Sequence, residues 1–233
     1  MQSRSDSSHN GFGTAASRGS SGLMKGFSAY LLMMAITTTA IAGDGTVIAR
    51  AESERSFPHK NSALPPAIKE IYEYYEVCGC SEKDLQCDLK QKSCSWTDGK
   101  KYDSVTSWKI TWDYNYNRMA DVCVADSFRV NVEVTFRYPK WVRNVDAPRP
   151  LMEKWDSYLN SLILHENGHR DIVVEAANEL SLAVAELPPA RSCAELDRTI
   201  TALSRVRMAK VTKKQNEHDV VTNHGRTEGA LFP

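Results

Sequence analysis

Residues 149–180 read RPLMEKWDSYLNSLILHENGHRDIVVEAANEL, and this stretch decides the fold. Proline is favoured at the first helical position, so Arg149-Pro150 indicates a helix start, and Pro188-Pro189 ends the pattern. Between them, inward-facing candidates recur every three or four residues, the spacing of one buried helical face. They are Leu151, Trp155, Tyr158, Leu162, His165, His169, Ile172, Ala176 and Leu180. We therefore predict a long helix that packs through this stripe.

Two segments upstream alternate strictly between apolar and polar residues. Residues 108–116 place tryptophan, isoleucine and tyrosine on one face, and residues 128–138 place phenylalanine, valine and tyrosine on one face. Period-two alternation predicts strands with one buried and one solvated face, and so antiparallel neighbours. Pro139 is expected to end the second strand. The aromatic and β-branched run at 70–77 predicts a further strand.

Two more helices complete the pattern. Ser81 and Asp84 resemble a capping box and predict a short helix that runs to about Gln91. A second long helix is expected over about 194–214, while residues 215–233 have no apolar period. Because strands come first and helices follow, we predict an α+β fold with an N-terminal antiparallel sheet.

Composition limits the function classes. The chain has 233 residues, 42% of them hydrophobic, and 29 basic residues balance 29 acidic ones. One sizeable domain, expected over 64–233, can bury its core. A net charge of zero gives no reason to expect nucleic acid as a partner.

The N-terminus has the features of an export signal. Lys25 precedes an apolar run over 27–42 that ends in Ala40-Ile41-Ala42, and a bilayer span needs about 20 residues. We assign residues 1–42 to a signal peptide with an N-terminal extension and 43–63 to a linker, with cleavage after Ala42 or Ala51. The protein is expected to be secreted or periplasmic, and to meet a membrane only through an uncleaved signal.

Six cysteines in an exported chain are expected to form disulfides. Six cysteines allow 15 pairings, and the sequence does not choose among them. Cys78, Cys80, Cys87 and Cys94 also have a spacing compatible with a four-thiolate zinc site, although an oxidising compartment favours disulfides.

The motif His-Glu-x-x-His at His165, Glu166 and His169 predicts a zinc site. Residues four apart share one helical face, so both imidazoles can bind one ion, and Glu166 lies about 100° around the helix. From there its carboxylate can act as a general base on water. The alternative is two hydrogen-bonded core histidines. Gly168 costs about 1 kcal/mol relative to alanine in a helix, which points either to close approach by another segment or to a kink.

A catalytic zinc site needs a third protein ligand. Glu175 and Glu179 lie too far along the same helix, about 9 and 15 Å from His169. We therefore look to Glu217–Gly229 and expect His224, in a Gly-flanked loop, to be the ligand. Asp219 is the alternative, or else it orients a ligating histidine from behind. His218 and Glu217 remain further options.

These residues together resemble the DUF922 family of secreted, predicted zinc-dependent proteases, with similarity over about 65–233. The motifs that carry the resemblance are His165–Asp171, Asp219-x-x-Thr-Asn-His-Gly225, Gly229–Pro233, Tyr74-Tyr75-x-Val77-x-Gly79, Thr106-x-Trp108-x-Ile110-x-Trp112 and Tyr138–Trp141.

The resemblance implies a zincin-like fold, with His165 and His169 as Zn²⁺ ligands and Glu166 as the base. Asp219 and His224 match the second motif, whereas His218 stands where the family pattern has tyrosine. The resemblance also implies a Cys123–Cys193 disulfide.

We therefore expect a zinc metallopeptidase that acts on peptides or proteins, with residues 128–137 as a candidate substrate-binding edge strand. Two other classes stay open. One is a non-enzymatic envelope protein with a structural zinc, and the other is a disulfide-stapled binding domain without a metal.

Overall fold

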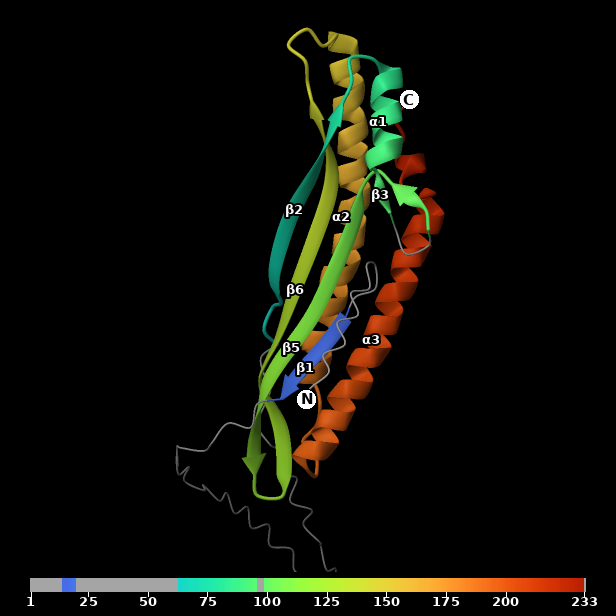
Figure 1. Ribbon diagram of the computed structural model, residues 1–233. Coiled ribbons are helices and arrows are strands. Elements are labelled where there is room, and N and C mark those ends of the chain that lie inside the picture. Colours follow the sequence, from blue (N-terminus) through green and yellow to red (C-terminus); the bar gives the residue numbers. More distant parts are fainter. Residues whose placement is uncertain (1–13, 20–62, 96–98, 233) are drawn as a thin grey trace, which may run out of the picture.

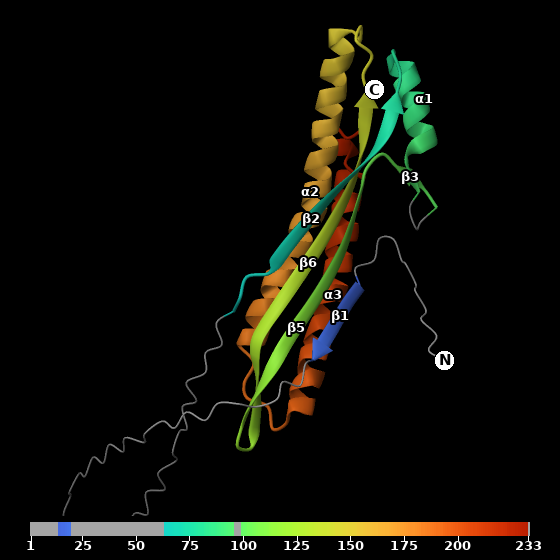
Figure 2. The same cartoon turned by 60° about the vertical axis from the view of Figure 1, so that its left-hand side comes forward.

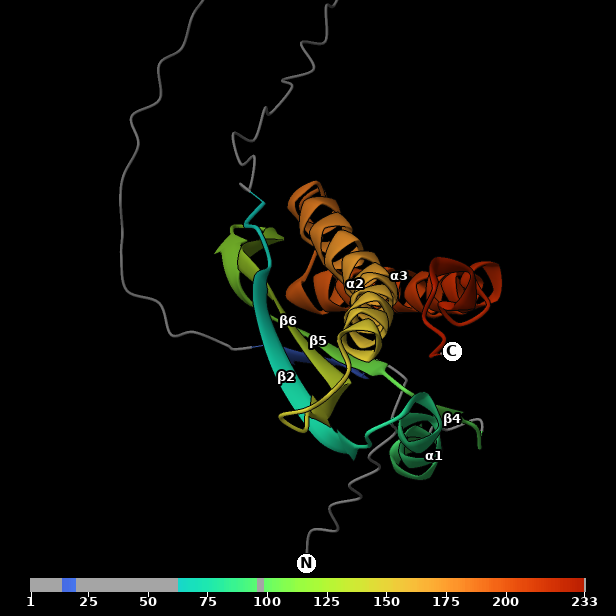
Figure 3. The ribbon, with the colours of Figure 1, turned by 90° about the horizontal axis from the view of Figure 1, so that it is seen from above.

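The computed structural model describes residues 14–19, 63–95 and 99–232. Within them, an elongated four-stranded sheet is covered on one face by two long helices, which confirms the predicted α+β class (Figure 1). The elements are β1 Thr14–Gly19, β2 Ala67–Cys78, α1 Glu82–Lys92, β3 Cys94–Ser95, β4 Lys101–Tyr102, β5 Val105–Met119, β6 Val122–Val142, α2 Arg149–Ala185, α3 Cys193–Thr222 and the 3-10 helix η1 Arg226–Glu228. Seen from above, α2 and α3 lie on the same side of the sheet (Figure 3).

The sheet is built around the hairpin of β5 and β6. The strand order is β1-β5-β6-β2, with β5 and β6 antiparallel and β2 parallel to β6 (Figure 2). The sheet is therefore mixed, and the prediction of an antiparallel sheet holds only for the β5–β6 pair. The even-numbered side chains of both hairpin strands face the helices, as the alternation predicts, and they include Ile110, Val130, Val132, Val134 and Phe136, all at most 1% exposed. Burying each such side chain stabilises the fold by about 1.5–3 kcal/mol.

Two expectations about β6 are wrong. Pro139 does not end the strand, which continues to Val142. The pairing of β5 stops at Arg137, so the missing N–H of Pro139 breaks no hydrogen bond to β5. Residues 128–137 are also not an edge strand, because β6 lies between β5 and β2 and is paired on both sides.

Helix α2 packs on the sheet through the predicted stripe. Trp155, Tyr158 and Leu162 are buried, and Trp155 packs on Trp141 of β6 and on Phe232, beyond η1. Further along, the buried face shifts by one residue, so that Val173 and Ala177 are fully buried while Ile172 is half-buried. The long stripe therefore ties the helix to the sheet along most of its length.

Helix α3 is longer than predicted. It ends at Thr222, and not near 214, so part of the expected C-terminal loop is helical. After Val211, the inward positions continue at helical spacing with Gln215, Asp219 and Thr222, and these three residues are polar. A search for apolar periodicity does not detect such a face.

A short strand near the N-terminus is a further difference. Thr14–Gly19 forms β1, parallel to Lys109–Tyr114 of β5, in a segment that the sequence assigned to the N-terminal extension. The remaining residues of the predicted signal and linker lie outside the described ranges, so those two assignments stay predictions.

The Cys123–Cys193 disulfide is confirmed and joins the start of β6 to the start of α3. It is compatible with an extracellular or periplasmic location. The disulfides expected for the other cysteines are absent from the described residues, where Cys78, Cys80, Cys87 and Cys94 are free. Cys94 is buried in the core, whereas Cys78, Cys80 and Cys87 are exposed and lie in or near α1. Within the described ranges, none of the helices is both long and apolar enough to cross a membrane.

Replacing Cys123 and Cys193 together with serine should lower the free energy of unfolding by about 2–5 kcal/mol, because the crosslink spans 70 residues of chain. Urea unfolding followed by circular dichroism measures the change. Serine at the exposed Cys78 and Cys87 is the matched control and should shift stability by no more than about 0.5 kcal/mol. Equal midpoints for the two double variants would contradict a stabilising role of the disulfide.

Candidate metal centre

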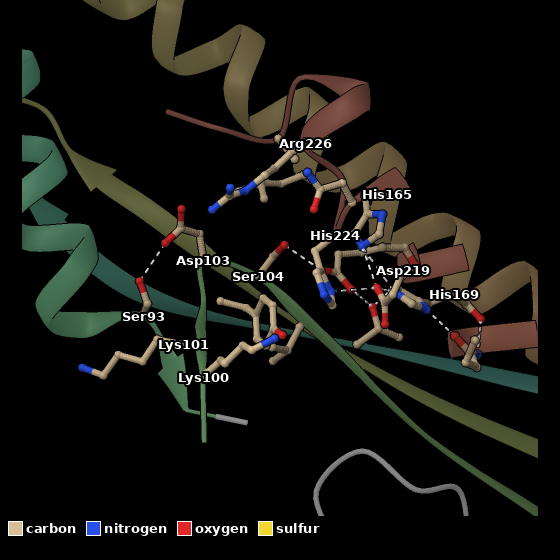
Figure 4. A pocket seen from close by; sticks show the side chains of 18 of the residues that line it. Ser93, Lys100, Lys101, Asp103, Ser104, His165, His169, Asp219, His224 and Arg226 are labelled. Atoms are coloured by element: carbon tan, nitrogen blue, oxygen red, sulfur yellow. Dashed lines mark hydrogen bonds and ion pairs between the residues drawn. The ribbon is translucent and has the colours of Figure 1, made fainter. Parts of the chain in front are cut away.

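A cavity of about 810 Å³ lies between the middle of α2, the C-terminal half of α3 and the start of β5. Figure 4 shows His165, His169, Asp219 and His224 gathered at one end of it. The histidines of the motif come from α2, and Asp219 comes from the part of α3 that the sequence did not predict as helix. The two long helices therefore bring together residues 50 or more positions apart.

The side chains of His165, His169 and Asp219 contact one another in all three pairs. The two Nε2 atoms are 3.3 Å apart, and Asp219 Oδ1 lies 3.1 Å from His169 Nε2 and 3.4 Å from His165 Nε2. A zinc ion bound tetrahedrally at 2.0–2.1 Å separates its ligand atoms by about 3.3–3.4 Å. The separations of this trio, 3.1–3.4 Å, are therefore close to those expected for three ligands of one zinc ion.

The other ring nitrogens of the two histidines are held by acceptors. His165 Nδ1 lies 3.2 Å from Glu228 Oε2, and His169 Nδ1 contacts Gln215 Oε1. Gln215 Nε2 donates to the carbonyl of His169 at 2.9 Å, which fixes the orientation of the amide. Because a carboxylate and an amide oxygen only accept, both Nδ1 atoms carry the proton. When the imidazoles are neutral, both Nε2 atoms can offer a lone pair to a metal, whereas a protonated imidazole donates from Nε2 to Asp219 instead.

Asp219 stays charged in this setting. Burial disfavours the carboxylate, but hydrogen bonds with His165 and His169 outweigh burial and hold its pKa below the usual range. Burial also disfavours a charged His169, yet Asp219 and Glu166 more than offset it and raise the pKa of His169. The carboxylate thus supplies negative charge where a cation would sit.

His218 packs against the pair from one side. Nitrogens of His165, His169 and His218 lie within 4.8 Å of one another, so three histidines could hold a metal ion. The His218 ring, however, stacks on His165 at an interplanar angle of 13°, and its Nε2 lies 3.1 Å from the carbonyl oxygen of His165. Two ligands of one zinc ion are at most about 4.2 Å apart, so Asp219 fits the third position more closely than His218 does.

Gly168 makes this packing possible. A Cβ at that position would lie 2.5 Å from His218 Nε2. Of the two roles that the sequence left open for Gly168, close approach by another segment is the one observed.

Glu166 is almost fully buried. Its carboxylate is held by two hydroxyl groups, one from Thr106 of β5 and one from Ser104 directly before that strand. Ser104 Oγ donates to Oε1 at 2.6 Å, and Thr106 Oγ1 donates to Oε2 at 2.5 Å. Each carboxylate oxygen keeps a second acceptor position, and the side chain lines the cavity. The carboxylate is therefore both fixed in place and able to take a proton.

His224 reaches the same end of the cavity from beyond α3. Asn223, His224 and Gly225 all have positive φ angles, of 49°, 53° and 76°. Two consecutive left-handed non-glycine residues are costly and tend to occur at functional sites. The turn packs Gly225 against the His165 ring and leaves His224 39% exposed, with Nδ1 3.4 Å from Asp219 Oδ1.

Sequence reasoning missed the residues that support the site: Ser104, Thr106, Gln215, Thr222 and Glu228. Thr106 of β5 and Ser104, directly before that strand, are both even-numbered and buried, so polar residues on an otherwise apolar face were a usable signal. Gln215 and Thr222 continue the inward spacing of α3. Nothing in the sequence marked Glu228 as a partner of His165.

The fold and this cluster define an α+β protein with a histidine-rich candidate metal centre. The family model described as "Bacterial protein of unknown function (DUF922)" matches residues 72–225. The chain therefore belongs to the DUF922 family. No curated protein and no solved structure matches it.

Gly168→Ala tests the contact with His218. Alanine favours a helix over glycine by about 1 kcal/mol, whereas overpacking costs about 1–3 kcal/mol. We expect the substitution to destabilise the native protein but to stabilise a His218→Ala variant, where the space is open. Thermal unfolding of the four proteins in this double-mutant cycle measures the difference. Stabilisation of both backgrounds would refute the contact.

Proposed function

We propose that this protein is an exported zinc-dependent peptidase whose metal is held by His165, His169 and Asp219. The observation that carries the proposal is the mutual contact of these three side chains at 3.1–3.4 Å. It is supported by the Nδ1 partners Gln215 and Glu228, which leave both Nε2 atoms free to bind. Asp219 thus takes the place that the sequence gave first to His224.

The zincin-like character of the fold belongs to this proposal. A helix carries the motif beside a sheet, as in that class. The two histidines of the motif line the cavity together with residues of α3 and β5. The chemistry that a bound zinc ion supplies is Lewis acidity, which makes water more acidic and polarises a carbonyl group.

Glu166 is the proposed general base. Its buried carboxylate takes a proton from the water that attacks the peptide carbonyl, and then passes it to the departing amine as the C–N bond breaks. Ser104 and Thr106 hold the carboxylate in one orientation, so little ordering remains to be done in the reaction. Tyr158 is not available for the reaction, because its hydroxyl donates to Asp103 Oδ2 at 2.7 Å.

We assign the substrate-binding edge to β5, and not to residues 128–137 of β6 as the sequence predicted. Val105, Thr106 and Trp108 line the cavity, and β1 pairs with β5 only from Lys109 to Tyr114. Among the strands that the structure describes, none pairs with Val105–Trp108 on that edge. Cleavage of the predicted signal after Ala42 would also remove β1 and lengthen the open edge. An extended peptide can then add to β5 through main-chain hydrogen bonds.

The second candidate function is a structural zinc site in a non-enzymatic protein. Its support is His224, whose Nδ1 lies 3.4 Å from Asp219 Oδ1. With His224 as a fourth protein ligand, the site would be closed to water. The exposure of His224 and the size of the cavity favour the open, catalytic arrangement.

Metal content tests the ligand set. Alanine at His165, His169 or Asp219 should abolish stoichiometric zinc binding, while His218→Ala and His224→Ala retain it. Glu228→Gln should weaken affinity by about 10–100-fold, because it orients a ligand from behind. Elemental analysis and titration against a chelator give both readouts. Zinc loss in His224→Ala or His218→Ala, with retention in Asp219→Ala, would replace Asp219 by that histidine.

Glu166→Gln tests the reaction. We expect it to keep zinc and to lose about 10²–10⁴-fold in hydrolysis of a general protein substrate, which is the usual contribution of a general base. Glu153→Gln, an exposed carboxylate of the same helix, is the matched control and should keep full activity. Equal activity of Glu166→Gln and the native protein would exclude the mechanism, and absence of zinc from the native protein would favour a metal-free binding domain.

A further inference from the structure

We propose that two copies of this chain associate through the outer edge of β2, which pairs antiparallel with β2 of the second copy around a two-fold axis beside Ile71. The inference is independent of the proposed peptidase function, because β2 contributes no residue to the candidate metal centre or its cavity. The sheets of the two copies would then join into one continuous sheet.

β2 has an open edge. It runs for 12 residues along the left-hand side of the sheet in Figure 1 and pairs with β6 on one side. Among the strands that the structure describes, none pairs with its other side. Pro65 and Pro66 precede β2, and no proline interrupts it. The backbone N–H and C=O groups of this edge can therefore pair with a further strand.

Large apolar side chains of β2 are exposed beside this edge. Ile68, Tyr72 and Tyr74 are 47%, 51% and 58% exposed. They lie on the helix-covered face of the sheet, where Tyr72 stacks on the buried Phe136 with ring centroids 5.2 Å apart. A row of exposed apolar side chains next to an open strand edge is typical of a surface that contacts another protein.

Charge selects one register for a second copy. In a two-fold antiparallel pair, opposite residues share a face of the sheet, so the register is centred on a residue that lies opposite itself. Among the registers of this kind within β2, only the one centred on Ile71 places Lys69 opposite an acidic residue, namely Glu73. The symmetry repeats this opposite-charge pair on both sides of the axis.

The same register matches the apolar side chains. It places Ile68 opposite Tyr74, and Glu70 opposite Tyr72. Glu70 accepts a hydrogen bond from Tyr72 of its own chain at 2.6 Å and lies 3.4 Å from Arg170 Nη1, so its charge is partly offset before the copies meet. Both faces of the strand are thus complementary to a second copy, which is what stabilises a pair of strands.

Charge reversal at Lys69 and Glu73 tests the interface. The native full chain should sediment as a dimer whose fraction rises with concentration. Lys69→Glu creates two Glu–Glu pairs and Glu73→Lys creates two Lys–Lys pairs, so each variant alone should dimerise about tenfold or more weakly. An equimolar mixture restores both opposite-charge pairs, and dimers should return. Analytical ultracentrifugation over a concentration series measures the native chain, each variant and the mixture.

Lys109→Glu is the matched control. Lys109 is an exposed lysine of β5 that lies opposite Glu133 of β6, the residue whose carboxylate is 2.9 Å from Lys69 Nζ. The substitution thus places the same charge beside the same neighbour, but away from the edge of β2, and should leave the dimer unchanged. Recovery in the mixture also excludes misfolding as the reason why the two edge variants dissociate.

A cysteine at Ile71 tests the register. Opposite residues of an antiparallel pair have Cα atoms about 4.5–5.5 Å apart, a separation that a disulfide spans. In a chain with serine at Cys78, Cys80 and Cys87, Ile71→Cys should therefore form a crosslinked dimer on oxidation, seen on a non-reducing gel. Lys69→Cys in the same background should not, because its copy would lie about 13 Å away along the strand.

A native chain that stays monomeric at every concentration would overturn the proposal and leave the edge of β2 to a strand of another protein. A dimer that persists in both charge variants would place the interface elsewhere and overturn it as well. The same conclusion would follow if the mixture did not recover dimers or if Ile71→Cys did not crosslink. All of these results leave the peptidase proposal untouched.

Discussion

The close approach of α3 to α2 at Gly168 is the constraint on which the rest of the site depends. A side chain at Gly168 would collide with His218, and a wider spacing would withdraw Gln215 and Asp219 from His169. Glycine at position 168 lowers the intrinsic stability of α2, but it lets α3 come close enough for polar contacts between the two helices. Because neither helix supplies a complete site alone, the packing distance between them sets the geometry of the cluster.

The polar groups around the cluster form a network in which each member has one role. Gln215 and Glu228 each accept from one imidazole, and this leaves the opposite nitrogens facing Asp219. The hydroxyl groups of Ser104 and Thr106 hold Glu166 from the sheet side. Buried networks of this kind stabilise a unique arrangement only when every member is satisfied. Loss of one outer partner should therefore disturb the centre, even though that partner lies outside the trio of His165, His169 and Asp219.

The sequence predicted those parts of the fold whose inward faces are apolar. The alternation in β5 and β6 and the stripe of α2 follow directly from burial, and so do the positions of His165 and His169. It failed where the inward face is polar. The end of α3 appeared aperiodic because its inward positions are Gln215, Asp219 and Thr222, which are polar, and for the same reason the third partner of the histidines was assigned to a loop. Pairing order in the sheet depends on contacts between distant segments, so the interior position of β6 could not be derived from its own pattern.

The contribution of Gly225, Glu228 and Phe232 has a consequence for the timing of assembly. A chain that is synthesised from its N-terminus delivers the sheet first, then α2 with its histidines, then α3, and only afterwards these three residues. Gly225 packs against the His165 ring, Glu228 accepts a hydrogen bond from His165 Nδ1, and Phe232 packs on Trp155 and Tyr158. During synthesis, the two histidines therefore precede the residues that fix the orientation of His165. Segment 225–232 completes the surroundings of His165 only after α2 and α3 have been made.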